Sequence, residues 1–321
     1  MLFMFPGQGS QKIGMGKDLY DAFSSARDVF HEVNDAISFN LSDLIFFGSD
    51  DDLKLTKNAQ PALMTVSMAF VNVLKKDFSL DISEKARFFA GHSLGEYSAL
   101  CAAGVISIAD TARLLRTRGL AMASACGEDG SMAAIMGLNL DVVEKILAEL
   151  GDDNFFVESK SNMAKKTVLQ VANDNSSGQV VISGHKAAVE KAMIKFRESG
   201  AKRTVLLDVS GPFHCELMEA AVEPLKETLD SVIFSSPIRP IISNVIAEAV
   251  SDNFKELLLR QLVFRVRWRE SMMFAAENSV TKAVEIGSGK VLAGLMKRIV
   301  PSVECQSVNS LEAAEDFCKK I

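Results

Sequence analysis

The sequence lacks the cysteine patterns of metal sites and disulfide frameworks. Its cysteines are Cys101, Cys126, Cys215, Cys305 and Cys318, an odd number with no C-x-x-C pair. They sit mostly in apolar or helical-looking sequence. This pattern is typical of reduced thiols in a cytosolic protein.

Long hydrophobic runs and a basic amino-terminal segment are also missing. The apolar stretch at the start ends after five residues, at Pro6, and contains no lysine or arginine. A secretory signal needs a basic region and a longer apolar core, and a membrane span needs about 20 apolar residues. We therefore expect a cytoplasmic protein that does not enter a membrane.

Positive charge is not in excess. Lys plus Arg number 35 against 41 for Asp plus Glu, which gives a formal net charge of −6. No global positive field is available to hold nucleic acid or an anionic membrane, so an anionic partner must meet a local basic patch. The composition is otherwise globular, with 48% apolar residues. At about 150 residues per domain, the length predicts two domains, or one large α/β domain with an insert.

Apolar runs of strand length alternate with helical periodicity in the first third of the chain. Residues 1–5 predict a strand that ends in a glycine-rich turn, and residues 17–37 place apolar side chains on one helical face. Residues 58–76 predict a second, largely buried helix. Residues 87–90 predict a short strand that runs into a sharp turn and a helix over 96–103. The pattern is that of β-turn-α units.

The middle of the chain has a different order of elements. The periodicity predicts strand, helix, strand, strand, helix and strand at residues 132–136, 140–150, 168–171, 180–183, 187–197 and 204–207. This βαββαβ order is that of a ferredoxin-like module. The last third returns to α/β alternation, with predicted strands at 238–245, 283–286 and near 303 and predicted helices at 253–263, 268–278 and 291–299. We therefore divide the chain into a large α/β unit of residues 1–128 and 208–321 and an insert of residues 129–207.

The strongest chemical signal is Gly91-His92-Ser93-Leu94-Gly95, a G-x-S-x-G motif between a predicted strand and a predicted helix. The two glycines permit a tight turn that exposes the serine hydroxyl at the start of the helix. Free N–H groups and the positive end of the helix dipole favour a developing oxyanion there. Ser93 is therefore the candidate nucleophile. The competing interpretation is a helix cap in which Ser93 only bonds the first turn.

One of the four histidines is well placed to act as the base for such a serine. His31 lies in the polar part of a helix, His185 opens a helix of the insert, and His92 is directed elsewhere on the tight turn. His214 lies in a Gly-Pro loop that leaves the last strand of the insert, which suits an imidazole held over a neighbouring site. Asp208 precedes it, but its place in that strand fits poorly with reaching the ring. We therefore expect a backbone carbonyl to orient the imidazole.

Two glycine-rich turns suggest nucleotide binding, but their spacing does not support it. After Gly7-Gln8-Gly9, a G-x-G-x-x-G motif needs glycine at position 12, which is Lys12. Gly287-Ser288-Gly289-Lys290 lacks the earlier glycine of a P-loop. Both are predicted to be tight turns, with Gln8 as a candidate amide donor at the site.

Several further motifs occur in a fixed order along nearly the whole chain. They are Phe5-Pro6-Gly7-Gln8-Gly9-Ser10-Gln11, Gln60-Pro61-Ala62, Gly91-His92-Ser93-Leu94-Gly95-Glu96-Tyr97-Ser98-Ala99, Arg118-Gly119, Gly211-Pro212-Phe213-His214 and Glu285-Ile286-Gly287. Together they resemble malonyl-CoA:acyl carrier protein transacylases. The resemblance implies an α/β-hydrolase-like large subdomain with a ferredoxin-like insert. It also implies transfer of malonyl from coenzyme A to the phosphopantetheine thiol of acyl carrier protein, through a malonyl-serine intermediate, in fatty acid biosynthesis.

The resemblance also assigns roles to residues at the expected reaction centre. Ser93 would be the nucleophile, and His214 would be the base that takes its proton. The backbone N–H groups of Gln8 and Leu94 would stabilise the oxyanion.

Two further residues receive roles in the same way. Arg118 would bind the free carboxylate of malonyl, since a planar guanidinium makes two charge-assisted bonds to a carboxylate. The backbone carbonyl of Gln261 would orient His214. From the residues alone, Arg118 fits an exposed helix charge beside Arg113 and Arg116.

Two other classes of function stay open at this point. A serine esterase or thioesterase would hydrolyse thioesters without a carrier protein and would tolerate the loss of Arg118. A non-catalytic carrier-binding module would keep the fold, although Ser93, His214, Gln8 and Arg118 together argue against it. The resemblance implies no metal or redox cofactor, only a coenzyme A thioester as substrate.

The implied carrier protein is usually acidic, so a local basic docking patch is expected despite the net charge. The candidates are Lys75, Lys76, Lys160, Lys165, Lys166, Lys290, Lys297 and Arg298.

Overall fold

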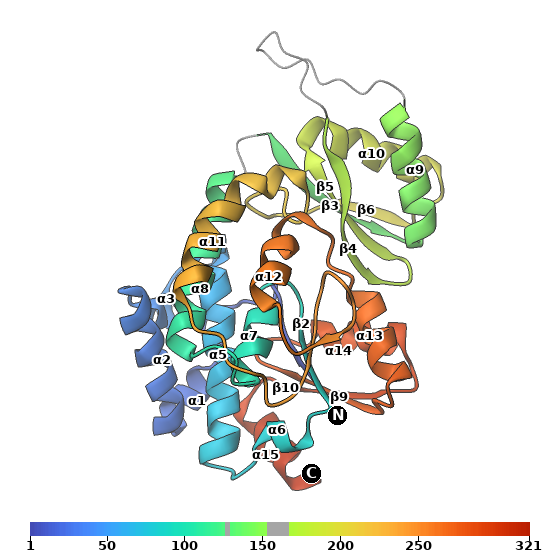
Figure 1. Cartoon of the computed structure of the whole chain (residues 1–321). Coiled ribbons are helices and arrows are strands. Elements are labelled where there is room, and N and C mark those ends of the chain that lie inside the picture. Colours follow the sequence, from blue (N-terminus) through green and yellow to red (C-terminus); the bar gives the residue numbers. More distant parts are fainter. Residues whose placement is uncertain (126–128, 153–166) are drawn as a thin grey trace.

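The computed structural model describes residues 1–125, 129–152 and 167–321. It is an α/β protein with a mixed, mainly parallel six-stranded sheet and a separate four-stranded antiparallel sheet (Figure 1). Cys126 and the three docking candidates Lys160, Lys165 and Lys166 lie outside the described residues.

The larger sheet has the strand order β10-β9-β1-β2-β7-β8. Its neighbours pair in parallel except β7 and β8, which are antiparallel. The strands are β1 (Leu2–Phe5), β2 (Phe88–Gly91), β7 (Ile241–Ile242), β8 (Ala249–Val250), β9 (Lys282–Ile286) and β10 (Glu304–Val308). Because β1, β2 and β7 are parallel neighbours, the loops that follow them meet at one edge of the sheet.

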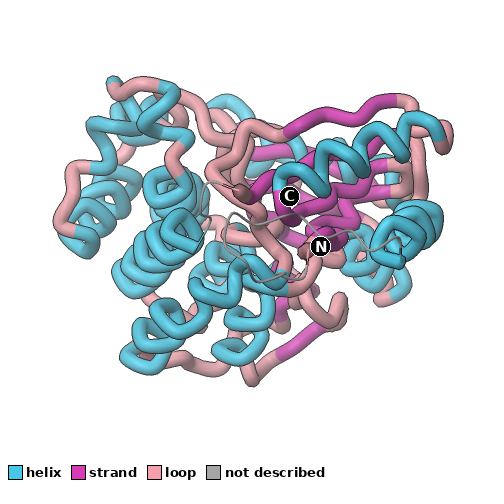
Figure 2. Tube along the Cα trace, turned by 90° about the horizontal axis from the view of Figure 1, so that it is seen from above, coloured by secondary structure: helices cyan, strands magenta, loops and turns pink. Residues whose placement is uncertain are grey.

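Side chains of the larger sheet alternate between two apolar layers. In β1, Leu2 and Met4 pack on one face and Phe3 and Phe5 on the other, because successive strand residues point to opposite faces. The first layer is closed by α13 (Trp268–Glu277) and α14 (Val291–Ile299), and the second by α2 (Ser24–Ile37), α5 (Thr56–Lys76), α7 (Gly95–Ala102), α8 (Ile108–Ala125), α11 (Val222–Ser231) and α15 (Leu311–Lys320). Seen from above, a large group of helices lies to one side of the strands (Figure 2).

The second sheet has the order β4-β5-β3-β6 and is antiparallel throughout. Its elements are β3 (Gly130–Met136), α9 (Leu140–Asp152), β4 (Leu169–Ser176), β5 (Gln179–His185), α10 (Lys186–Glu198) and β6 (Arg203–Leu206). Ile135 and Ile182 of the strands form a separate core with Val143 and Phe196 of the two helices. The order of strands and helices predicted for this stretch is confirmed.

Strand β4 joins the smaller sheet to the larger unit. Val266 donates its backbone N–H to Ala172 O at 2.8 Å and accepts from the N–H of Asp174 at 3.0 Å, as a neighbouring strand would. The buried carboxylate of Asp174 also pairs with Arg269 at 2.9 Å. A buried carboxylate without a partner is costly, so this pair holds β4 against the start of α13.

The predicted helix over residues 17–37 was wrong as a single element. The structure has α1 (Lys17–Ala22) and then α2, because Phe23 between them is extended, with φ −124° and ψ 133°. The Phe23 ring packs edge-on against Phe78. Tertiary packing of one aromatic side chain therefore interrupts a helical pattern that is continuous in the sequence.

The strand predicted over residues 238–245 is much shorter in the structure, where only β7 forms. Pro240 has no N–H for a strand ladder, although its carbonyl accepts from Phe89 at 3.0 Å. Two residues after β7, the N–H of Asn244 donates to the Glu96 carboxylate at 3.2 Å and not to another strand. A side-chain acceptor thus ends the strand at the edge where the loops meet.

The remaining elements connect these layers. They are α3 (Leu41–Phe47), α4 (Asp50–Lys54), α6 (Ile82–Lys85), the 3₁₀ helix η1 (Glu216–Ala221) and α12 (Phe254–Val263). Within the three described ranges, no helix is both long and apolar enough to cross a membrane.

Candidate active site

Ser93 lies on a strained turn between β2 and α7. Its φ is +53°, in the left-handed region that non-glycine residues avoid, at a cost of order 1–3 kcal/mol. The turn is so tight that a Cβ on Gly91 would lie 1.9 Å from the backbone of Gly95. The glycines of the motif are therefore required for close approach, as the sequence predicts.

The turn after β1 packs directly on this elbow. His92 donates its N–H to Phe5 O at 3.1 Å, and a Cβ on Gly95 would meet the same oxygen at 2.2 Å. A Cβ on Gly7 would lie 2.7 Å from His92 O. This contact places Gln8 beside Ser93 at the carboxyl ends of the neighbouring parallel strands β1 and β2.

Asn244, which follows the end of β7, supports the turn at Ser93. Its Oδ1 accepts the N–H of Ser93 at 2.8 Å, and its Nδ2 donates to Gly91 O at 2.8 Å. The Asn244 side chain is fully buried, so these two bonds fix the strained turn at its two ends. Asn244 was not among the site residues predicted from the sequence. The available signal was a polar residue directly after a strand whose end adjoins that of β2.

His214 contacts the hydroxyl of Ser93. Its Nε2 lies 2.8 Å from Ser93 Oγ, and its Nδ1 lies 2.7 Å from the backbone oxygen of Gln261 in α12. A carbonyl only accepts, so Nδ1 carries the proton and Nε2 is free to accept from the hydroxyl. Burial, together with the charge of Arg118, lowers the pKa of His214 to about 3, so the imidazole is neutral.

Arg118 is buried, which corrects the interpretation as an exposed helix charge. Its side chain is 1% exposed, and its Nη2 donates to Ser93 Oγ at 3.0 Å and to Gln261 Oε1 at 2.9 Å. The guanidinium also lies over the ring of Tyr97, 5.5 Å from its centroid. Gly119 lets α8 approach α5, because a Cβ there would lie 2.6 Å from the Cα of Lys57. This packing turns Arg118 inward.

The other candidate acid and histidines have partners elsewhere. Asp208 pairs with Lys54 at 3.3 Å and is exposed, in agreement with its exclusion as a partner of the imidazole. His92 bonds Asn175 Oδ1 at 2.8 Å. His185 accepts the N–H of Val168 through Nδ1 at 2.9 Å, and His31 lies 3.1 Å from the hydroxyl of Tyr20.

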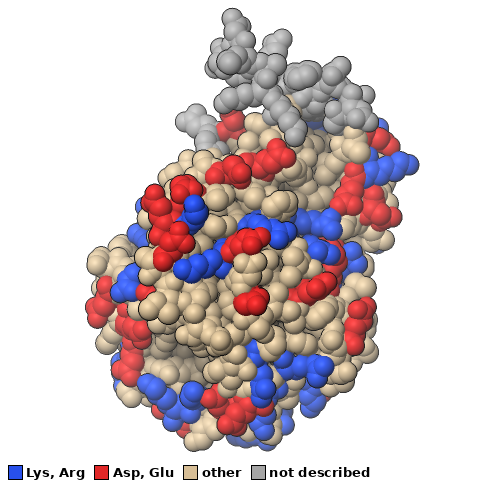
Figure 3. Space-filling view, viewed as in Figure 1, with Lys and Arg blue, Asp and Glu red and all other residues tan. Residues whose placement is uncertain are grey.

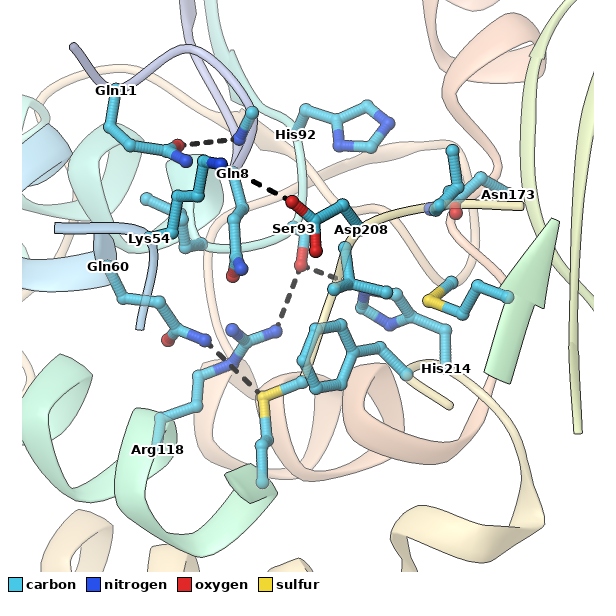
Figure 4. Close-up of a pocket in the computed structure, with 17 residues that line it drawn as sticks. Gln8, Gln11, Lys54, Gln60, His92, Ser93, Arg118, Asn173, Asp208 and His214 are labelled. Carbon is cyan, nitrogen blue, oxygen red and sulfur yellow. Dashed lines mark hydrogen bonds and ion pairs between the residues drawn. The ribbon is translucent and has the colours of Figure 1, made fainter. Parts of the chain in front are cut away.

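A cavity of about 290 Å³ lies at the strand ends, and Ser93, His214, Arg118, Gln8 and Leu94 all line it. Figure 4 shows Arg118 and His214 approaching Ser93 from different sides. Lys54 and Asp208 also line the cavity, and their exposed side chains form its rim. The apolar part of the lining is formed by Met122, Met132, Leu207, Val209 and Phe213. An activated hydroxyl, a buried cation and apolar walls suit a small acyl group that carries a carboxylate.

Comparison with known proteins gives a consistent result. The acyl transferase domain family matches residues 2–311. The malonyl CoA-acyl carrier protein transacylase of Bacillus subtilis (strain 168) is 42% identical over 316 residues, which cover 98% of this chain and 94% of the relative.

Two solved structures are similar over their full length. The acyl-carrier-protein-S-malonyltransferase from Bartonella henselae has a TM-score of 0.92 and 48% identity, covering 99% of this chain and 98% of that one. A malonyl-transacylase in complex with its type II PKS acyl-carrier protein has a TM-score of 0.89 and 36% identity, covering 100% and 99%. With the family match over nearly its whole length, this chain belongs to the malonyl CoA-acyl carrier protein transacylases of the acyl transferase domain family.

Proposed function

We propose that this chain is an [acyl-carrier-protein] S-malonyltransferase that moves malonyl from malonyl-CoA to the phosphopantetheine thiol of acyl carrier protein, for fatty acid biosynthesis. Membership of the family supports the reaction, because full-length relatives at about 40% identity have this activity as their name. The single observation that carries the chemistry is the 2.8 Å contact between Ser93 Oγ and His214 Nε2.

In the first half of the reaction, Ser93 attacks the thioester carbonyl of malonyl-CoA. His214 takes the hydroxyl proton at Nε2 and passes it to the departing coenzyme A thiolate. The backbone N–H groups of Gln8 and Leu94 hold the oxyanion, and loss of one such donor typically costs about 3–4 kcal/mol. The carbonyl of Gln261 keeps the proton on Nδ1, so Nε2 faces the serine throughout.

In the second half, the carrier thiol attacks the malonyl-serine ester. His214 takes the thiol proton and returns it to the oxygen of Ser93 as the ester bond breaks. Water competes with the thiol during the life of the ester. The apolar side chains of Met122, Met132 and Phe213 around the cavity favour the transfer by limiting the access of water.

Arg118 selects the acyl group by pairing with its free carboxylate. The same pairing affects the base, because the charge of Arg118 is one cause of the lowered pKa of His214. A bound malonyl carboxylate neutralises that charge and makes proton uptake by His214 easier. An acetyl group provides no such compensation, so selection acts on both binding and reaction.

The test is the mass of the intact protein after brief incubation with malonyl-CoA or acetyl-CoA. Wild type should gain one malonyl group, Ser93→Ala should gain none, and Arg118→Ala should lose its preference for malonyl. Arg113→Ala is the matched control, because that arginine is on the same helix, pairs with Asp110 and is exposed. Rapid release of free malonate would support a thioesterase. Absence of both adduct and turnover would support a non-catalytic carrier-binding protein.

We also propose the finer architecture implied by the sequence, with an α/β-hydrolase-like unit of residues 1–128 and 208–321 and a ferredoxin-like insert of residues 129–207. The βαββαβ order and the packing of both helices on one side of the antiparallel sheet support the insert. The strand, strained serine turn and helix around Ser93 support the hydrolase-like unit. The cytoplasmic location remains a prediction that rests on the cysteines.

The surface that meets the carrier protein also remains a prediction. On the face shown in Figure 3, Lys and Arg side chains form a band across the middle with acidic side chains between them. Among the candidates, Lys75 pairs with Asp81 at 2.8 Å and Arg298 donates to Gln179 at 2.8 Å. We expect carrier binding to weaken with ionic strength, because exposed charges are screened within about 10 Å at 0.1 M salt.

A further inference from the structure

Glu96 is a buried acid that the transfer scheme does not use. It lies in the first turn of α7 and is 3% exposed. Its Oε2 accepts from Gln261 Nε2 at 2.6 Å and from the N–H of Asn244 at 3.2 Å. Burial raises the pKa of Glu96 to about 7, against the opposing effect of these donors and of Arg118. A carboxylate is costly to bury, so its set of donors needs an explanation.

The side-chain amide of Gln261 lies between two groups of opposite charge. Its Oε1 accepts from Arg118 at 2.9 Å, while its Nε2 donates to Glu96 at 2.6 Å and to Ser93 O at 3.0 Å. A guanidinium only donates and a carboxylate only accepts. The reversed amide would present its NH₂ to the guanidinium and its oxygen to the carboxylate, and both bonds would be lost. The two charges therefore determine which way the amide points.

We propose that Glu96 is a positioning residue that acts through the Gln261 amide on Arg118, and thereby determines how well the site accepts an acyl group with a free carboxylate. This inference rests on the proposed function and deepens it. Gln261 contributes one bond to the guanidinium, Ser93 contributes another, and the Arg118 Nε has no hydrogen-bond partner in the described part of the chain. The buried cation is thus held in place by two bonds at Nη2, while Arg118 lines the cavity that would receive a substrate carboxylate.

The inference predicts an effect that depends on the acyl group. Without an acceptor at position 96, Gln261 Nε2 keeps its bond to Ser93 O but loses its bond to a charged partner, so the amide is held less firmly and its bond to Arg118 weakens. Malonyl needs Arg118, whereas acetyl needs only Ser93, His214 and the oxyanion donors. The ratio of malonylation to acetylation should therefore fall, while the acetylation rate changes little. A purely structural role would lower stability or slow both acylations alike.

The experiment measures the rates of Ser93 malonylation and acetylation by intact mass, in a single turnover, for protein shown to be folded by circular dichroism. In Glu96→Leu the malonyl-to-acetyl ratio should fall about tenfold, since a hydrogen bond to a charged group is lost. Glu96→Gln keeps an acceptor oxygen and should retain the ratio within about threefold. If Glu96→Leu does not fold, Glu96→Asp makes the same test, because it withdraws the carboxylate by one methylene.

Glu285→Leu is the matched control. Glu285 is another buried carboxylate, in β9, and it accepts the N–H of Ala293 at 2.9 Å without lining the cavity. Its substitution should leave the ratio unchanged. A second control combines Glu96→Leu with Arg118→Ala, where the change at position 96 should have no further effect on the ratio.

Three results would overturn the inference. They are an unchanged ratio in folded Glu96→Leu or Glu96→Asp, an equal fall in both acylations, and a fall of the same size in Glu285→Leu. If wild type forms no malonyl adduct, the proposed function fails together with the inference. If wild type forms the adduct and only the ratio test fails, the function stands and Glu96 is not a positioning residue.

Discussion

The inner wall of the cavity and its rim are built in opposite ways. On the inner wall, Arg118 and His214 are at most 4% exposed, and they bond Ser93 and the buried Gln261 at 2.7–3.0 Å. At the rim, the ion pair of Lys54 and Asp208 spans 3.3 Å, and its side chains are 49% and 91% exposed.

The difference follows from what each surface has to recognise. A buried polar group must keep its partner, because an unpaired one costs about 1–3 kcal/mol. An exposed ion pair contributes about 0–1 kcal/mol and exchanges readily with water. We therefore expect selection of the acyl group to depend on the preset groups of the inner wall, and the exposed rim to adapt to the pantetheine arm of a large partner.

Among substitutions on the inner wall, we expect His214→Ala to have the largest effect on the reaction. We expect the rate of Ser93 malonylation to fall about 10²–10⁴-fold, because the hydroxyl loses its general base. His185→Ala is the control, since that ring accepts the backbone N–H of Val168 at 2.9 Å and does not line the cavity. A rate within a few fold of wild type for folded His214→Ala would show that another group takes the proton.

A smaller effect is expected when Asn244, which supports the Ser93 turn, is replaced. In Asn244→Ala the N–H of Ser93 loses its acceptor, which should cost about 1–3 kcal/mol and slow malonylation about tenfold. Thermal unfolding and single-turnover rates measure the two effects. The control is Asn278→Ala, because the Asn278 side chain donates to Phe274 O at the end of α13 and does not line the cavity. An unchanged rate would mean that the turn at Ser93 keeps its conformation without Asn244.

The pH dependence sharpens the comparison, because burial lowers the pKa of His214 on the inner wall. An ordinary histidine with a pKa near 6.5 loses about tenfold of its neutral form between pH 7.5 and 5.5. Since the pKa of His214 is lowered to about 3, the base stays available as the pH falls. The test uses Glu96→Gln, because burial raises the pKa of Glu96 to about 7 and its titration would overlap this range. We expect the malonylation rate of this variant to change less than about twofold between pH 7.5 and 5.5. A tenfold fall centred near pH 6.5 would contradict the assignment of a neutral, buried base.

The smallest effect is expected at the rim. In Lys54→Ala the free energy of unfolding should fall by less than about 1 kcal/mol, as is usual for an exposed pair. Malonylation should keep its wild-type rate, because Lys54 bonds neither Ser93 nor Arg118. A tenfold loss would place Lys54 among the groups that bind the acyl donor. Lys17→Ala, which breaks another exposed pair, with Asp21, is the control for both measurements.

Features that depend on local sequence could be predicted well. The tight turn at Ser93 needs glycine on both sides, and the strand, turn and helix around it are formed by consecutive residues. The four-stranded sheet was predictable for the same reason, because its elements follow one another along the chain. The interrupted helix at Phe23 was not, since its cause is the ring of Phe78, far away in sequence.

Parts of the site depend on contacts that the sequence does not display. Without the family resemblance, Arg118 fits an exposed helix face, but it is buried where α8 packs closely against α5 at Gly119. Asn244 and Glu96 gain their partners because β2 and β7 are neighbours in the sheet, although 151 residues separate Ser93 from Asn244. Polar residues at strand ends were the available signal, but strand order was needed to interpret them.

The sequence by itself determined the chemistry that is present: a serine on a glycine-flanked turn, a histidine in a Gly-Pro loop and an arginine on a helix. Tertiary structure alone decided which of these groups meet. The reason is physical: hydrogen bonds form over about 3 Å, and the order of parallel strands and the packing of helices bring residues more than 100 positions apart to that distance.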